Sequence, residues 1–202
     1  MNKDNKVFKS MIFPMFLVLT IWIVEYIEVS YDLNFISYGI IPRTKEGLIG
    51  IITSPFIHAN LSHLVSNSIP LFLMLWALFY FYYEIAFLIF ILLFFMTDIL
   101  VWIFARDASH IGASGLVYAT GSFLFFSGII RRSTKLLAIS LLITFMYGGM
   151  IWGIFPKFYP PDISWEAHLM GAISGFIIAI IFRKKGPQRE KYDWEDEDDN
   201  EE

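Results

Sequence analysis

Six runs of apolar residues follow one another along the chain, separated by polar segments. A helix needs about 20 mainly apolar residues to cross the hydrocarbon core of a bilayer. The pattern therefore predicts an all-α membrane protein, a bundle of six transmembrane helices. The predicted spans lie near residues 11–29, 61–82, 84–104, 113–130, 135–153 and 165–183.

The predicted spans divide the chain into three parts. Residues 1–10 form an N-terminal segment, residues 11–183 a helical domain, and residues 184–202 an acidic tail. The tail is too charged to bury apolar surface, so we expect it to be disordered. The longest connection, residues 30–60, mixes apolar residues with Gly and Pro. A loop of that length is usually functional or has structure of its own.

Composition narrows the class of protein further. Hydrophobic residues make up 56% of the chain and charged residues 17%, and the mean hydropathy is +0.59. A soluble domain has about 45–50% apolar and about 25% charged residues. An ordinary soluble enzyme, a disordered chain and a nucleic-acid-binding protein are therefore disfavoured. The chain has no Cys, which removes disulfides, thiolate metal sites and a cysteine nucleophile.

The placement of Lys and Arg predicts the orientation in the membrane. With six spans both termini lie on one side, and that side would hold eleven of the 15 basic residues. We therefore predict that both termini are cytoplasmic, in the plasma membrane of a bacterium. The net charge of −4 does not describe the helical domain, because nine of the 19 acidic residues lie between Glu190 and Glu202.

A few polar side chains lie at one common depth, near the predicted outer ends of the spans. His58 precedes the second span, and His63 and Asn67, four positions apart, share a face in its first turns. Ser114 begins the fourth span and His168 the sixth. Polar groups in hydrocarbon are costly, and they mark either function or helix packing. A single layer of them favours a functional site.

The residue types in this layer indicate nucleophilic catalysis. A serine needs a base to take its proton, and His168 is a suitable base for Ser114. Donors for an oxyanion are the Asn67 amide, the His63 imidazole and the backbone N–H of Ser114 near a helix start. Glu166 is two positions from His168 and faces elsewhere on a helix. A Ser-His dyad is therefore the simpler hypothesis.

Small residues accompany both members of this pair. His168, Gly171 and Gly175 fall on one face of the sixth span, and the spacing of the two glycines lets helices approach closely. Ser114 and Tyr118 share a face of the fourth span. Close packing of these two helices would bring Ser114 Oγ within hydrogen-bond reach of His168. Ordinary packing of membrane helices explains the glycines equally well.

At these residues the sequence resembles the rhomboid family of intramembrane serine proteases. Three elements carry the resemblance, in the family's order and spacing and on the second, fourth and sixth spans. It covers about residues 11–183. The elements are His58-x4-His63-x3-Asn67, Gly112-x-Ser114-Gly115-x2-Tyr118 and Ala167-His168-x2-Gly171-x3-Gly175.

The resemblance implies a role for each residue. Ser114 would be the nucleophile and His168 the general base, with His63, Asn67 and the Ser114 backbone N–H as the oxyanion hole. Tyr118 would pack against His168. The residues with an implied supporting role are His58, Tyr118, Gly112, Gly115, Gly171 and Gly175.

The resemblance also implies the reaction, a rhomboid-type six-helix fold and the partners. The substrates would be other membrane proteins, cut within the lipid bilayer near the outer end of a single transmembrane segment. A gate made by the fifth span and the loop 154–164 would admit them sideways. No cofactor, metal or nucleic acid is implied.

Two positions depart from the family pattern. Many members carry a Trp-Arg pair in the first loop, and the matching stretch Leu48–Thr53 has none. How this loop is anchored is therefore open. Pro70 lies inside the second span, where it either kinks the helix or is tolerated in the lipid setting.

Three other interpretations stay open. His58, His63 and His168 could together hold zinc, although the HExxH spacing is absent. A catalytically silent rhomboid-like protein would bind transmembrane segments without cutting them, but such members typically lack the serine or the histidine. A transporter would need several charged residues along a path through the bilayer.

Two polar residues lie outside the three elements. His110 matches nothing in the pattern, and we interpret it as a loop residue. Asp98 lies in the third span, where a charge is expensive. We expect its carboxyl to bond a neighbouring backbone or side chain, as a structural anchor.

Overall fold

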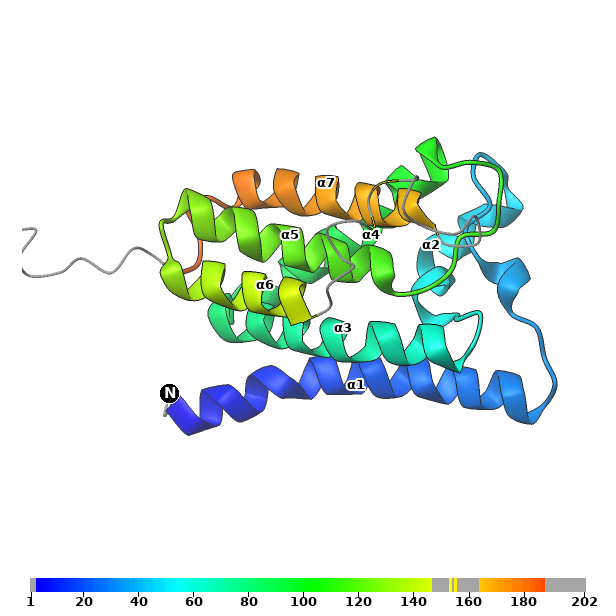
Figure 1. The fold of residues 1–202 in the computed structure, drawn as a ribbon, viewed down its shortest axis with the longest axis horizontal. Coiled ribbons are helices and arrows are strands. Elements are labelled where there is room, and N and C mark those ends of the chain that lie inside the picture. Colours follow the sequence, from blue (N-terminus) through cyan, green and yellow to red (C-terminus); the bar gives the residue numbers. More distant parts are fainter. Residues whose placement is uncertain (1–2, 147–152, 154, 156–163, 188–202) are drawn as a thin grey trace, which may run out of the picture.

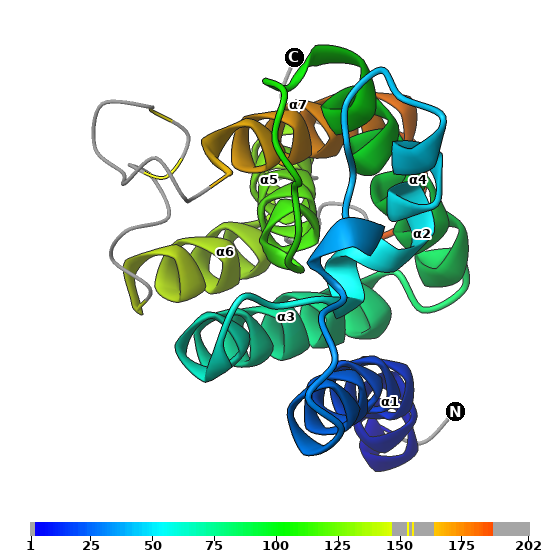
Figure 2. The ribbon, with the colours of Figure 1, turned by 90° about the vertical axis from the view of Figure 1, so that its right-hand side faces the viewer.

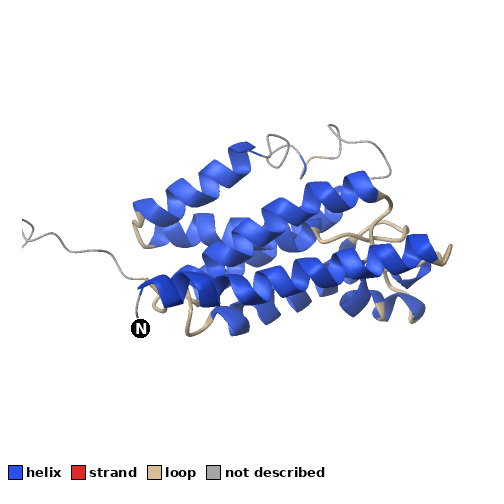
Figure 3. Ribbon diagram, turned by 90° about the horizontal axis from the view of Figure 1, so that it is seen from below, coloured by secondary structure: helices blue, strands red, loops and turns tan. Residues whose placement is uncertain are grey.

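Helices account for most of the described chain, which comprises residues 3–146, 153, 155 and 164–187 of the computed structural model. The six longest helices of these residues lie side by side (Figure 1). Within the described residues there is no strand, as Figure 3 shows, so the predicted all-helical architecture is confirmed. The six helices are α1 Lys3–Ser30, α3 Leu61–Phe81, α4 Ala86–Phe104, α5 Ser114–Ile130, α6 Thr134–Met146 and α7 Trp165–Ile181.

Three of these helices are long and apolar enough to cross a membrane, judged by length and composition. They are Asn5–Ser30 within α1, α3 and α4. Helices α5 and α7 are apolar but shorter, with 17 residues each. Residues 147–152 of the fifth predicted span, and most of the loop 154–164, lie outside the described residues. The helices thus follow the predicted order, and three of them have the length that a span requires.

Helix α1 begins at Lys3, well before the predicted start of the first span at residue 11. Its first turns contact the far end of α3. Lys6 Nζ lies 5.0 Å from the centre of the Tyr80 ring, and Trp76 Nε1 donates a hydrogen bond to Ser10 Oγ at 3.1 Å. These contacts stabilise a polar extension of the helix that a search for apolar runs does not detect.

Helix α5 lies in the middle of the bundle, between α3, α4, α6 and α7 (Figure 2). Its most extensive contact is with α7. A Cβ atom added to Gly171 would lie 2.2 Å from the carbonyl oxygen of Gly115. One added to Gly175 would lie 2.2 Å from the carbonyl oxygen of Ala119. Only glycine permits two helix backbones to approach so closely.

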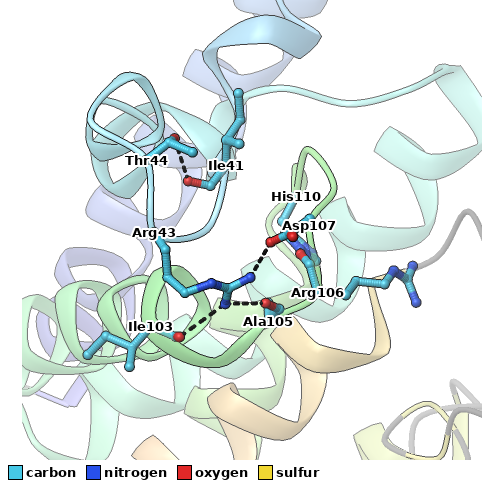
Figure 4. Close-up of polar contacts among 8 residues, drawn as sticks. All are labelled: Ile41, Arg43, Thr44, Ile103, Ala105, Arg106, Asp107 and His110. Atoms are coloured by element: carbon cyan, nitrogen blue, oxygen red, sulfur yellow. Dashed lines mark hydrogen bonds and ion pairs between the residues drawn. The ribbon is translucent and has the colours of Figure 1, made fainter.

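The first loop is built from short helical turns, and Arg43 anchors it to the end of α4 (Figure 4). The Arg43 guanidinium donates to the carbonyls of Ala105 at 2.7 Å and Ile103 at 3.2 Å and pairs with Asp107. The last carbonyls of a helix have no partner within it, so Arg43 caps α4. The turns are η1 Ile36–Tyr38, η2 Glu46–Leu48, α2 Gly50–Thr53 and η3 Ser54–Phe56.

Trp102 adds a second contact between this loop and α4. Its Nε1 donates to the Thr44 carbonyl at 3.0 Å, and the Arg43 backbone N–H donates to the Trp102 carbonyl at 3.0 Å. A tryptophan and an arginine therefore hold the loop here. They come from α4 and from residue 43, not from the stretch Leu48–Thr53.

Two expectations about single residues have different outcomes. Helix α3 continues through Pro70 from Leu61 to Phe81, so the proline is tolerated. Asp98 is buried in α4, and its Oδ2 has no hydrogen-bond partner among the described residues. The expected anchoring bond is therefore absent at that oxygen.

Arg131, just after α5, caps the C-terminal end of α7. Its guanidinium donates to the carbonyls of Phe182, Lys185 and Pro187, the last at 3.1 Å, and its Nε donates to Ser127 Oγ at 3.2 Å. The side chain is buried. An arginine with five donors suits a cluster of carbonyls that no helix bond satisfies.

Replacing Arg131 should therefore cost stability. We expect Arg131→Met to lower the free energy of unfolding by about 2–4 kcal/mol, because buried carbonyls lose their donor. Arg132→Met changes the exposed neighbour and should cost less than about 0.5 kcal/mol. Thermal unfolding of both variants in detergent measures the difference, and equal Tm values would contradict the capping role.

Candidate active site

Ser114 and His168 meet where α5 and α7 begin. The Ser114 Oγ and His168 Nε2 atoms are 2.8 Å apart, and both side chains are buried. Ser114 is the first residue of α5, and His168 lies in the first turn of α7. Gly171, one turn further along α7, touches the Gly115 backbone and so holds the two helix starts together.

The other ring nitrogen of His168 decides which way the proton lies. His168 Nδ1 is 2.9 Å from the Gly153 carbonyl oxygen, which can only accept. In the neutral ring Nδ1 therefore carries the hydrogen, and Nε2 accepts the hydroxyl proton of Ser114. This is the tautomer that a general base needs.

The Tyr118 ring fixes the plane of the His168 ring. The two rings stack with centres 4.2 Å apart and an angle of 9° between their planes. Glu166, the nearest acidic residue in sequence, forms an ion pair with Arg106 at 3.4 Å. Within the described residues, the arrangement around Ser114 is thus a serine-histidine pair, oriented by a carbonyl and an aromatic ring.

His63 and Asn67 lie beside Gly112, two positions before Ser114. A Cβ atom added to Gly112 would lie 2.6 Å from the His63 ring and 3.5 Å from Asn67 Nδ2. Asn67 is buried, and its Nδ2 has no hydrogen-bond partner among the described residues. An unpaired buried donor costs about 1–3 kcal/mol. A donor left in this state beside Gly112, two positions before Ser114, is available to a ligand.

His58, in the loop before α3, contacts both His63 and the segment that precedes Ser114. Its ring centre lies 5.0 Å from that of His63, and its Nε2 accepts the Ala113 backbone N–H at 3.5 Å. Burial and, to a lesser extent, neighbouring His63 together lower the pKa of His58 to about 3, against an opposing effect of the Phe56 carbonyl. His58 is therefore neutral at physiological pH, as an acceptor of an N–H must be.

The histidines do not form a recognisable metal site. No group of three or more His, Asp or Glu residues with the geometry of a metal site occurs in the part of the chain that the structure describes. Both nitrogens of His168 are occupied by Ser114 and Gly153. The arrangement favours proton transfer over metal coordination.

Comparison with known proteins identifies the family. The model of the rhomboid domain matches residues 45–185, which include every residue of the candidate site. The chain belongs to the rhomboid family. Together with its apolar helices, this membership indicates an integral membrane protein of a family that consists mostly of intramembrane serine proteases.

Similar proteins occur in mycobacteria and in a virus. An uncharacterized protein of Mycobacterium tuberculosis is 32% identical over 184 residues, covering 85% of this rhomboid and 74% of the relative. One of Mycobacterium leprae is 31% identical over 188 residues, covering 84% and 69%. A protein of Acanthamoeba polyphaga mimivirus whose given name assigns it to the rhomboids is 28% identical over 176 residues, covering 83% and 89%.

Two parts of this rhomboid's site were missed by the sequence analysis. The Gly153 carbonyl orients His168 through the backbone, which no side-chain pattern reveals. His110 lies in the loop between α4 and α5, as interpreted from the sequence, but that interpretation did not reveal that it is buried and that both of its ring nitrogens are bonded, to Ser164 Oγ and to the Arg106 carbonyl. The sequence signal that could have pointed to His110 was its spacing: it lies four residues before Ser114, just as Ser164 lies four residues before His168.

Substitution of Gly112 should disturb the part of the rhomboid site that holds His63 and Asn67. Its φ is +103°, and an added Cβ would enter the space of the His63 ring. We expect Gly112→Ala to lower the free energy of unfolding by about 2–3 kcal/mol, from backbone strain and overpacking.

Gly115→Ala is the matched control, because Gly115 is helical and its added Cβ would meet the Thr97 methyl at 3.1 Å. Alanine in a helix recovers about 1 kcal/mol, which offsets that contact. Denaturation of the two variants in detergent compares them. A Gly112→Ala protein as stable as Gly115→Ala would show that His63 is not held against this backbone.

Proposed function

We propose that this rhomboid is a serine endopeptidase that cuts single transmembrane segments of other proteins inside the bilayer. The observation that carries the proposal is the 2.8 Å contact between Ser114 Oγ and His168 Nε2, buried and in the tautomer of a base. A serine that only packed against a histidine would not need that tautomer or a stacked tyrosine.

The reaction follows from this geometry. Ser114 Oγ attacks the scissile carbonyl carbon while His168 Nε2 takes the hydroxyl proton. His168 then gives the proton to the leaving amine, the peptide C–N bond breaks, and an acyl ester remains on Ser114. Water attacks the ester, His168 again takes and returns a proton, and the carboxyl product and free Ser114 are released.

The donors around Gly112 would stabilise the negative oxygen that forms in both steps. Asn67 Nδ2 is a buried donor without a partner among the described residues, and His63 lies beside it. The backbone N–H of Ser114 belongs to the first turn of α5, where N–H groups have no partner within the helix. In a site with little water such donors act strongly.

The position of the site supports cleavage near the outer end of the substrate. The dyad lies at the starts of α5 and α7, whereas Arg131, Lys185 and the start of α1 lie at the opposite end of the bundle (Figure 1). Basic residues favour the cytoplasmic side. With six spans, both termini would be cytoplasmic and the protein would reside in a bacterial plasma membrane.

Loss of either dyad residue should abolish cleavage. Purified protein in detergent is incubated with a model single-span substrate, and Ser114→Ala and His168→Ala should each reduce kcat by more than about 1,000-fold, since the two act as a unit. The control Ser174→Ala removes a buried α7 hydroxyl that bonds the Met170 carbonyl of its own helix, and should cleave normally. Cleavage that persists in Ser114→Ala refutes the proposal, and a silent wild-type protein favours a rhomboid-like binding protein.

Asn67 should affect turnover without affecting stability. We expect Asn67→Ala to lower kcat by about 100- to 1,000-fold, the usual cost of losing one oxyanion donor. Its Tm should not fall by more than about 2 °C, because Nδ2 has no bond to lose among the described residues. Ser66→Ala, at the exposed neighbouring position, is the control. A normal kcat for Asn67→Ala would remove this residue from the proposed oxyanion hole.

A further inference from the structure

A buried hydrogen bond joins the segment that precedes Ser114 to the residue that starts α7. His110 is 2% exposed, and its Nδ1 lies 2.6 Å from Ser164 Oγ. Its Nε2 lies 2.9 Å from the carbonyl oxygen of Arg106. Ser164 is the N-cap of α7, and its Oγ accepts the backbone N–H of Ala167 at 3.2 Å.

The directions of these bonds follow from the Arg106 carbonyl, which can only accept. Nε2 of His110 therefore carries the hydrogen, and Nδ1 accepts the hydroxyl proton of Ser164. Burial lowers the pKa of His110, only partly offset by the Arg106 carbonyl and Glu166, so the neutral ring is the stable form. One chain of hydrogen bonds thus runs from Arg106 through His110 and Ser164 to Ala167, the residue before His168.

The two side chains hold equivalent places relative to the dyad. His110 lies four positions before Ser114, and Ser164 lies four positions before His168. Since four residues are about one helical turn or a short loop, a shift of either side chain is passed on to the dyad member beside it. The bond between them is therefore a second link between α5 and α7, on the loop side of the dyad.

The backbone on both sides of this bond is fixed independently. The backbones of His110 and Ile40 exchange two hydrogen bonds of 2.9 Å, which attach the segment to the first loop. Ile40 also packs with Ala167 in a small apolar cluster. Because the backbone on both sides is held in place, a change in the His110–Ser164 distance would move Ser114 relative to His168.

A second contact between the same segments is weaker. Arg106 and Glu166 form an ion pair at 3.4 Å, but the Arg106 side chain is 39% exposed. Water screens such a pair, which is worth less than about 1 kcal/mol. Figure 4 shows His110 beside Arg106 and Asp107. The buried His110–Ser164 bond is therefore the stronger link.

We propose that His110 and Ser164 are positioning residues of this rhomboid. Their hydrogen bond holds the start of α7 at the distance where His168 accepts the proton of Ser114. Neither residue touches the reacting atoms. The inference rests on the proposed protease activity, and it concerns the rate of that reaction and not the binding of the substrate.

The test compares kcat and KM for cleavage of the model substrate in detergent, well below the Tm of each variant. We expect His110→Phe and Ser164→Ala each to lower kcat by about 10- to 100-fold, because a displacement of about 1 Å at a catalytic pair has effects of that size. KM should stay within about twofold, since substrate contacts are unchanged. Ser164→Thr keeps both the hydroxyl and the N-cap, and should retain most of the wild-type kcat.

Two controls separate positioning from general stability and from capping. Ser109→Ala removes a hydrogen bond from the neighbouring residue to the Ile36 carbonyl of the first loop, and should leave kcat unchanged. The double variant His110→Phe/Ser164→Ala should be no slower than the slower single variant, because both lose the same bond.

The possible results decide the inference clearly. Normal kcat in both single variants, or a KM rise that accounts for the whole effect, overturns it. Multiplying effects in the double variant also overturn it, since Ser164 would then act only as a cap. A wild-type protein that does not cleave overturns the protease proposal itself. If His110→Phe does not fold, Ser164→Asp decides: aspartate keeps the N-cap but has no hydroxyl proton to give to His110 Nδ1, so a wild-type kcat in this variant overturns the inference.

Discussion

The contact between Gly171 and the Gly115 carbonyl oxygen determines how closely α5 and α7 approach, and the candidate site depends on that separation. A Cβ atom at Gly171 would stand 2.2 Å from this oxygen. Ser114, the residue before Gly115, and His168, about one turn before Gly171, lie 2.8 Å apart. Two short polar side chains reach each other across a helix interface only when the backbones nearly touch. Glycine at position 171 is therefore required both for the packing of α5 against α7 and for the hydrogen bond between Ser114 and His168.

Two arginines complete the bundle at its opposite ends by the same physical means. Arg43 caps α4 beside the candidate site, and Arg131 caps α7 at the far end. In each case the guanidinium comes from another segment, so satisfying the last carbonyls of one helix also fixes the position of a second element. A membrane protein has little water with which to satisfy such carbonyls inside its apolar region. The buried Arg131 side chain fits this description, whereas the Arg43 side chain is 48% exposed.

The sequence predicted the helices better than it predicted what orients the site. Long apolar runs and the Ser114 and His168 motifs are local patterns, so the order of the helices and the meeting of these two residues could be foreseen. The start of α1 at Lys3 depends on contacts of Lys6 and Ser10 with α3, which apolar periodicity does not register. The Gly153 carbonyl and the His110–Ser164 bond were also missed, because a backbone acceptor has no side-chain signal and because neither His110 nor Ser164 belongs to a recognised motif. The expected partner of Asp98 Oδ2 is absent among the described residues.

The central claim is that the contact with His168 makes Ser114 a nucleophile. The most direct measurement is the mass of the intact protein after treatment with a fluorophosphonate, followed by mapping of the modified peptide. Our account predicts one adduct per chain, on Ser114, and its loss when His168 is replaced by alanine. An adduct on another residue, or unchanged labelling of Ser114 in the His168→Ala variant, would contradict it.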